Sequence, residues 1–381
     1  MNLIRTTLTF VIITSMILVS ISSKESVVDP TYAADYEGDW HHRLIKSNDA
    51  WDITQGRKEI VVAIIDSGVD FSHPDLINTQ WINVGEIADN SIDDDGNGYV
   101  DDVYGWDFIS NDSNPGPTSS DPVNWHATFI AGIIAAPKDD FGVVGIAPNV
   151  TIMNVRILDV DNYVYSYETF GDAIRYAAEN GADVINLSII ASDNSSLYMD
   201  EIEYANSLNI PVVAATGNSD LSVVAHPAKS DNVIAVGASN RKNEKADYSN
   251  YGEETELVAP VGDANEDNIR STVPPDQYGT GWGTSFAGPQ VSATIALMKS
   301  LNDSLSVAEI RDILHKSAKD LGDPGHDILT GYGLLNVLKA VQAVLDPSIL
   351  LPNDSTYQLL AILPALITLT LVVFRRKNSC G

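Results

Sequence analysis

Apolar residues form runs of six to eight along the middle of the chain, and more polar stretches separate these runs. Runs of this length without an alternating polar face indicate strands buried on both sides of a parallel sheet. The five runs are 59–66, 151–158, 183–189, 211–216 and 232–238. Between the second and third runs, residues 167–181 repeat apolar positions at helical spacing, from Phe170 to Ala177.

This alternation of strands and helices predicts an α/β fold, a doubly wound and mostly parallel sheet with helices on both faces. Three further helices are predicted, from Ser285, from about Val307 and from about Leu334. No internal repeat or long low-complexity linker interrupts the pattern, so we predict one domain over residues 40–346. A sheet of this kind binds ligands beyond the carboxyl ends of its strands.

The N-terminal residues 1–23 have the layout of a secretory signal peptide: one basic residue, Arg5, then a long apolar run and two small residues. An uncleaved membrane anchor is the alternative, although the run is short for a span. Residues 24–39 are expected to form a short extension. The adjoining His41 and His42 have no acidic partner in a matching motif, so we expect them at the surface.

A second apolar run, residues 357–374, lies near the C-terminus. As a helix it would be about 27 Å long, just enough to cross a hydrocarbon core. Three basic residues at 375–377 follow at once, which favours a cytoplasmic tail over 375–381 and an external domain. We therefore expect a linker at 347–356 and a single transmembrane helix, with the chain in the cell membrane and its domain on the extracellular side. A buried soluble helix is the alternative.

The charge balance is strongly acidic, with 22 Lys and Arg against 52 Asp and Glu and a formal net charge of −30. Such a balance argues against a nucleic-acid partner, because phosphate backbones attract Lys and Arg. Cys380 is the only cysteine, which excludes an intramolecular disulfide and a thiolate zinc site. We expect the external domain to be monomeric.

Four polar residues stand where a parallel α/β sheet places chemistry. Asp66 ends the first apolar run and Asn218 follows the fourth, while His126 and Ser285 each open an apolar helical stretch. Taken singly, Asp66 can cap a turn, His126 can start a helix, and Ser285 can be an N-cap. Taken together they fit nucleophilic catalysis, in which Asp orients His, His accepts the proton of Ser, and Asn helps to hold an oxyanion.

The order of these residues and the segments around them resemble the subtilisin family of serine peptidases, the subtilases. The matching segments are IIDSGVDFSHPDL around Asp66, HATFIAGIIAA around His126, INLS at 185–188, AATGNSD around Asn218 and GTSFAGP around Ser285. The resemblance covers roughly residues 40–345. It implies a subtilisin-like fold and the hydrolysis of peptide bonds through an acyl-enzyme on Ser285. Asp66 and His126 would complete the triad, and the Asn218 amide would lie in the oxyanion hole.

The resemblance also places a peptide or protein substrate as a strand beside an exposed segment corresponding to Ser188, Ile189 and Ile190. Ile190 stands where the family motif usually has Gly, and a branched side chain there can fill the main specificity pocket or block the strand. Ala127, directly after the His, and Trp282, before the Gly-Thr-Ser triplet, are further departures. The alternative function is therefore a catalytically weak or inactive relative that binds extended peptides.

The acidic segment SIDDDGNGYVDD at 91–102 resembles the start of an EF-hand loop, with oxygen ligands at alternate positions and Gly98 at the sixth. The candidate ligands are Asp93, Asp95, Asn97, Asp101 and Asp102. Tyr104 replaces the Glu at the twelfth position, so the segment is not an EF-hand. We expect a structural Ca²⁺ here, holding a long loop beside the active-site rim. A solvated acidic loop and a calcium-dependent adhesion module are the alternatives.

Overall fold

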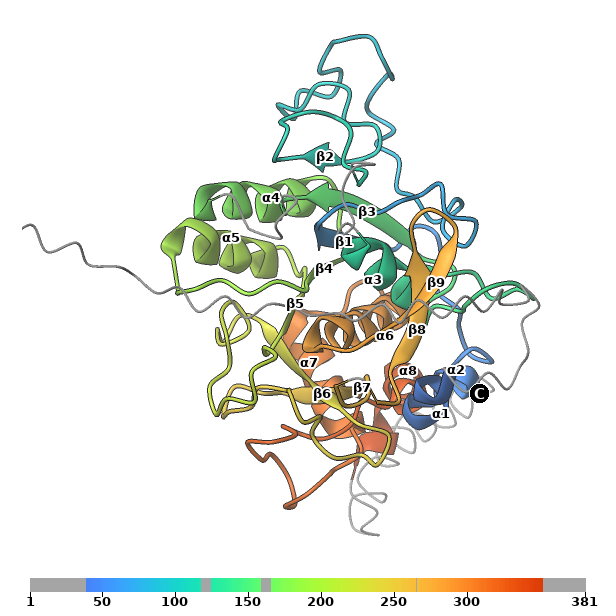
Figure 1. The fold of residues 1–381 in the computed structure, drawn as a ribbon, viewed down its shortest axis with the longest axis vertical. Helices are drawn as coiled ribbons and strands as arrows, with labels where there is room; N and C mark the ends of the chain where they lie inside the picture. Colours follow the sequence, from blue (N-terminus) through green and yellow to red (C-terminus); the bar gives the residue numbers. More distant parts are fainter. Residues whose placement is uncertain (1–38, 118–124, 159–165, 265, 352–381) are drawn as a thin grey trace, which may run out of the picture.

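The computed structural model describes residues 39–117, 125–158, 166–264 and 266–351 (Figure 1). The predicted signal peptide, nearly all of the extension before the domain, the C-terminal apolar run and the basic tail lie outside these residues. Within the described ranges, no helix is both long and apolar enough to cross a membrane.

Seven strands form one sheet in the order β2-β3-β1-β4-β5-β6-β7, and every neighbouring pair is parallel. The strands are β1 (Val61–Asp66), β2 (Trp106–Asp107), β3 (Thr151–Arg156), β4 (Val184–Leu187), β5 (Val212–Ala215), β6 (Ile234–Ser239) and β7 (Leu257–Pro260). The five strands predicted from the sequence are confirmed as β1, β3, β4, β5 and β6. The parallel α/β fold class is confirmed as well.

Both faces of the sheet are covered, which explains why its strands read as continuous apolar runs. In β1, Val62 and Ile64 belong to one hydrophobic core, and Ala63 and Ile65 belong to the other. The first core contains side chains of α3 (His126–Ala135), α6 (Gly288–Leu301) and α8 (Val337–Leu345). The second contains side chains of α4 (Tyr167–Glu179) and α5 (Ser196–Ser207). Figure 1 shows α4 and α5 side by side, with α4 next to β3.

The remaining elements lie around the sheet and the helices that cover its two faces. They are α1 (Trp40–Ile45), α2 (Ser47–Ala50), α7 (Val307–Ser317), the 3₁₀ turns η2 (Thr284–Phe286) and η3 (Pro347–Leu350), and the antiparallel hairpin of β8 (Ile269–Val273) and β9 (Gln277–Gly281). Two hydroxyl groups of β8, on Ser271 and Thr272, donate to backbone carbonyls of α3 at 2.7 Å each. The three late helices predicted from the sequence are also present. The one predicted from Ser285 begins as η2 and continues as α6, and the other two are α7 and α8.

The expectation that His41 and His42 lie at the surface is wrong, since both are buried. His42 Nε2 lies 3.0 Å from the carbonyl oxygen of Val144, and Nδ1 lies 2.7 Å from Ser47 Oγ. Because a carbonyl can only accept, Nε2 carries the hydrogen and Nδ1 accepts from the serine hydroxyl. Burial lowers the pKa of His42 to about 4, so this imidazole is neutral at neutral pH.

Candidate active site

The predicted catalytic residues gather at the carboxyl edge of the sheet. Asp66 is the last residue of β1, Ser188 follows β4, and Asn218 lies just beyond β5. The strand order reverses at β1, with β3 and β2 on one side and β4 to β7 on the other. Ligands of open α/β sheets bind in the crevice at such a switch point.

Asp66 and His126 form a buried pair. The two oxygens of Asp66 lie 2.8 and 3.0 Å from His126 Nδ1, and the Asp66 side chain has no exposed surface. Ser67 holds Asp66 and the residue after His126: its backbone N–H donates to Asp66 Oδ1 at 2.7 Å, and its hydroxyl accepts the N–H of Ala127 at 3.2 Å. A carboxylate accepts only, so Nδ1 carries the hydrogen and Nε2 is left as a proton acceptor.

Ser285 lies in η2, next to this pair, although its hydroxyl is bonded elsewhere. The ring of Phe286, the residue after Ser285, lies 5.5 Å from the His126 ring between centroids. Ser285 Oγ donates to the backbone carbonyl of Ser188 at 3.2 Å. His126 Nε2 is buried, and nothing in the described part of the chain hydrogen-bonds to it. Catalytic hydrogen bonds are often absent or long in a substrate-free site.

Asn218 is oriented by Thr284, a residue that the sequence analysis did not single out. The backbone N–H and the hydroxyl of Thr284 donate to Asn218 Oδ1 at 2.7 and 2.8 Å. The Thr284 hydroxyl also accepts the N–H of Gly217 at 3.1 Å. Gly283 has a φ of +131°, and a Cβ there would lie 3.4 Å from Asn218 Nδ2. Thr284 precedes Ser285, so these bonds hold the Asn218 side chain, through its oxygen, to the turn that contains Ser285.

The segment expected to bind substrate is exposed only in part. Ser188 and Ile189 are buried, at 5% and 6% exposure, whereas Ile190 is 44% exposed. The expectation of an exposed three-residue segment is therefore wrong for the first two side chains. Ile190 is the member whose side chain can meet a ligand. Trp282 is half-buried and packs against Tyr248, with ring centroids 4.9 Å apart.

The acidic loop brings together a different set of carboxylates from the predicted one. Oxygen atoms of Glu86, Asp95 and Asp102 lie within 4.8 Å of one another. Asp93 instead accepts the backbone N–H groups of residues 96–98, and Asp101 accepts those of residues 90 and 91. Glu86 lies outside the ligand spacing that the sequence analysis used, so that pattern did not find it.

The environment of this carboxylate cluster suits a cation. Burial raises the pKa of Asp102, and the nearby charge of Asp95 adds to this effect. Tyr176 Oη and the Asn83 amide donate to Asp102 at 2.6 and 2.9 Å, but none of the described ion pairs includes a cluster member. Residues 59–137 contain no Lys or Arg. A purely oxygen donor set is what Ca²⁺ prefers.

The acidic loop is tied to the C-terminal end of α4. Tyr176 and Asn180 of the α4 C-terminus hold Asp102 and Asn97, at 2.6 and 3.2 Å. This end of α4 leads into the start of β4. The place of the calcium loop beside the active-site rim stays a prediction.

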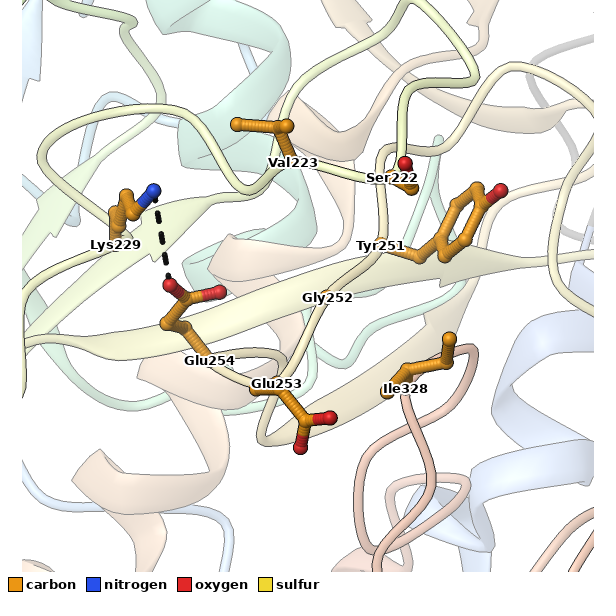
Figure 2. Close-up of a pocket in the computed structure, with 8 residues that line it drawn as sticks. All are labelled: Ser222, Val223, Lys229, Tyr251, Gly252, Glu253, Glu254 and Ile328. Carbon is orange, nitrogen blue, oxygen red and sulfur yellow. Dashed lines mark ion pairs between the residues drawn. The ribbon is translucent and has the colours of Figure 1, made fainter.

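A shallow depression lies in the loops after β5 and before β7 (Figure 2). It is lined by Ser222, Val223, Lys229, Tyr251, Gly252, Glu253, Glu254 and Ile328. Its one lysine, Lys229, lies 3.8 Å from Glu254 and is partly exposed. Exposed ion pairs of this kind contribute little stability. None of the predicted catalytic residues lines this depression.

The strand order, the Asp–His pair and the serine at a neighbouring helix start define the class of the chain, an α/β protein with an Asp–His–Ser constellation at the carboxyl edge of its sheet. Residues 57–333 match a family model described as the subtilase family. The chain belongs to this family.

Curated relatives agree with this assignment. The chain is 36% identical over 293 residues to the thermophilic serine proteinase of Bacillus sp. (strain AK1), which covers 77% of this chain and 64% of that protein. It is 35% identical over 288 residues to subtilisin NAT of Bacillus subtilis subsp. natto, and this match covers 74% of this chain and 66% of that protein. Subtilisin DY of Bacillus licheniformis is 33% identical over 294 residues, with 76% and 93% covered. The chain thus spans slightly less than two thirds of the first two relatives and most of the third.

Proposed function

We propose that this protein is a serine endopeptidase that hydrolyses peptide bonds through an acyl-enzyme on Ser285. The observation that carries the proposal is the buried Asp66–His126 pair, whose free Nε2 lies beside the turn that holds Ser285. Ser285 Oγ attacks the scissile carbonyl while His126 accepts its proton, and His126 then donates that proton to the leaving amine. Asp66 keeps His126 in the required tautomer, and the Asn218 amide donates to the oxyanion.

We further propose that an extended peptide lies along residues 188–190, with Ile190 limiting the side chains that fit. The 44% exposure of Ile190 supports this role. The same residue favours the alternative function, a relative that binds peptides without cutting them. An extracellular position, with a signal peptide and a membrane-spanning C-terminal helix, remains our proposal from the sequence pattern at the two ends of the chain.

Labelling with a fluorophosphonate, followed by peptide mapping, tests the proposed activity. We expect a single covalent adduct on Ser285 of the folded chain, together with cleavage of an unfolded protein substrate, because the probe reacts only with an activated serine. A folded chain that gains no adduct but binds extended peptides would favour the non-catalytic alternative. An adduct on another serine would reject Ser285 as the nucleophile.

We also propose a structural Ca²⁺ held by Glu86, Asp95 and Asp102. The ion would neutralise three close carboxylates and fix the acidic loop against α4. Asp93, Asp101 and Asn97 would shape the loop through their backbone and amide hydrogen bonds instead of forming the core of the site.

Removal of calcium by a chelator is expected to lower the melting temperature. A ligand at 100 times its Kd stabilises a fold by about 2.7 kcal/mol. For a domain of about 300 residues, this corresponds to roughly 4 °C in Tm, which thermal unfolding with and without added Ca²⁺ would measure. Glu86→Gln should abolish the calcium-dependent shift. Asp89→Asn, the same change of charge in the same loop but outside the cluster, should retain it. Equal shifts in both variants would rule out this ligand set.

A further inference from the structure

The backbone carbonyl of the proposed nucleophile has an unusual donor. Ser285 lies in η2, just before α6. No described backbone hydrogen bond joins its carbonyl oxygen to Gly288, three positions ahead, so the donor expected at the entry to an α-helix is the residue four positions ahead. That residue is Pro289, which has no N–H. The hydroxyl of Ser188 donates to the Ser285 carbonyl instead, at 2.8 Å. A side chain from the end of β4 therefore replaces the missing helical donor.

The Ser188 hydroxyl is itself held in a chain of buried polar groups. It accepts a hydrogen bond from Asn186 Nδ2 at 3.0 Å, and Asn186 Oδ1 accepts the hydroxyl of Ser292 at 2.9 Å. Ser188, Asn186 and Ser292 are 5%, 1% and 0% exposed. Ser292 belongs to α6, so the chain runs from this helix through β4 to the carbonyl of Ser285. Buried polar networks that are fully paired make a structure rigid.

Ser188 also contacts Ser285 at a second point. The Ser285 hydroxyl donates to the Ser188 carbonyl at 3.2 Å, so each serine binds the carbonyl of the other. To reach His126 Nε2, which is buried without a partner, Ser285 Oγ must leave the Ser188 carbonyl while the Ser285 backbone stays in place. The Ser188 hydroxyl is the group that fixes this backbone.

We propose that Ser188 is a positioning residue. Its hydroxyl, aligned by Asn186 and Ser292, holds the Ser285 main chain so that Oγ can pass between the Ser188 carbonyl and His126 Nε2. This role belongs to the side chain of Ser188 and is separate from main-chain contacts with a substrate strand. It rests on the proposed function, because it requires Ser285 to be the nucleophile.

A Ser188→Ala variant of the full chain tests this role. It removes the donor to Ser285 and keeps the backbone of residues 188–190, so KM for an extended peptide should stay within about twofold of the wild-type value. Both kcat and the rate constant of fluorophosphonate labelling should fall roughly 5- to 30-fold, the effect of leaving one buried polar group unpaired. Ser317→Ala is the matched control. Ser317 is buried, its hydroxyl donates to the Leu314 carbonyl at 3.2 Å, and it lies in α7, outside the proposed site.

The outcomes separate this inference from the proposed function. A wild-type chain that gains no adduct on Ser285 refutes the proposed function. A labelled wild type with an unchanged rate in Ser188→Ala refutes only the positioning role, and so does a raised KM with unchanged kcat. If Ser188→Ala does not fold, Ser188→Cys takes its place, since the thiol keeps the shape and is a weak donor. A lower labelling rate in that variant supports the proposal, and the wild-type rate overturns it.

Discussion

A Ser285→Ala variant is expected to hydrolyse peptides about 10⁶-fold more slowly than the wild-type chain, a magnitude established on a subtilisin. The substitution removes the hydroxyl of the proposed nucleophile, in the turn whose Phe286 packs on the His126 ring and whose Thr284 holds Asn218. Ser285 is 5% exposed, and within the described residues its hydroxyl makes one hydrogen bond, to the Ser188 carbonyl. The loss of that bond costs little folding free energy, so the variant should fold with nearly the wild-type Tm.

The same measurement distinguishes a triad from three independent residues. Adding His126→Ala to Ser285→Ala should lower kcat hardly further, because a nucleophile and its base act as a unit. Rates with a chromogenic peptide and the Tm of each variant provide the test. A Ser285→Ala variant that still gained a fluorophosphonate adduct would place the nucleophile elsewhere. A large further loss in the double variant would show that His126 acts outside the Ser285 pathway.

The sheet could be predicted from the sequence where strands are long and buried on both faces. β1 shows the reason, because Val62 and Ala63 face different cores and both have to be apolar. β2 has two residues, too few to produce such a run, and β7 ends in Pro260, a residue that argues against a strand in the sequence pattern. The β8–β9 hairpin was missed because its polar and glycine residues give no clear alternation of apolar and polar positions. Hydroxyl groups of β8 hold the hairpin to α3, and the apolar pattern does not report such bonds.

The sequence predicted which residues make up the candidate site. It did not predict the hydrogen bonds among them. Asp66 and Asn218 follow strands that end at one edge, and this position follows from the fold class. The hold of Thr284 on Asn218 and the reciprocal bonds of Ser188 and Ser285 depend on the tertiary packing of η2 against β4 and β5. No spacing in the sequence encodes such contacts between segments that lie 66 to 97 positions apart.

The acidic loop shows the limit of reading ligands by spacing. The alternate acids suggested Asp93 and Asp101, yet both use their oxygens to hold nearby backbone N–H groups. Glu86 joins Asp95 and Asp102 because the loop folds back on itself. Glu86 accepts the N–H groups of residues 94, 95 and 101. The fold of the loop, and not the spacing of its acids in the sequence, therefore decides which carboxylates lie close together.

Replacing Asp66 by asparagine is expected to lower kcat by about 10⁴-fold while the fold is retained, a magnitude known from serine peptidases. Asp66 Oδ1 accepts both the Ser67 N–H and the His126 ring, and Oδ2 lies 3.0 Å from Nδ1. In the Asp66→Asn variant the remaining side-chain oxygen would stay with the Ser67 N–H, and the new amide would donate to Nδ1. His126 would then carry its hydrogen on Nε2 and could not accept the proton of Ser285.

Asp183→Asn is the matched control for this prediction, because it makes the same change in a residue just before β4 whose carboxylate holds the opposite end of β1. Asp183 Oδ2 accepts the N–H of Val61, the first residue of β1, at 2.9 Å, far from the catalytic edge. This variant should lose some stability and keep the wild-type kcat. Rates with a peptide substrate and thermal unfolding of both variants are the measurements. If Asp66→Asn kept more than about a tenth of the wild-type kcat, the buried carboxylate would not set the tautomer of His126. If kcat fell as far in Asp183→Asn as in Asp66→Asn, the cause of the lower rate would be general damage to β1. The tautomer of His126 would then not explain it.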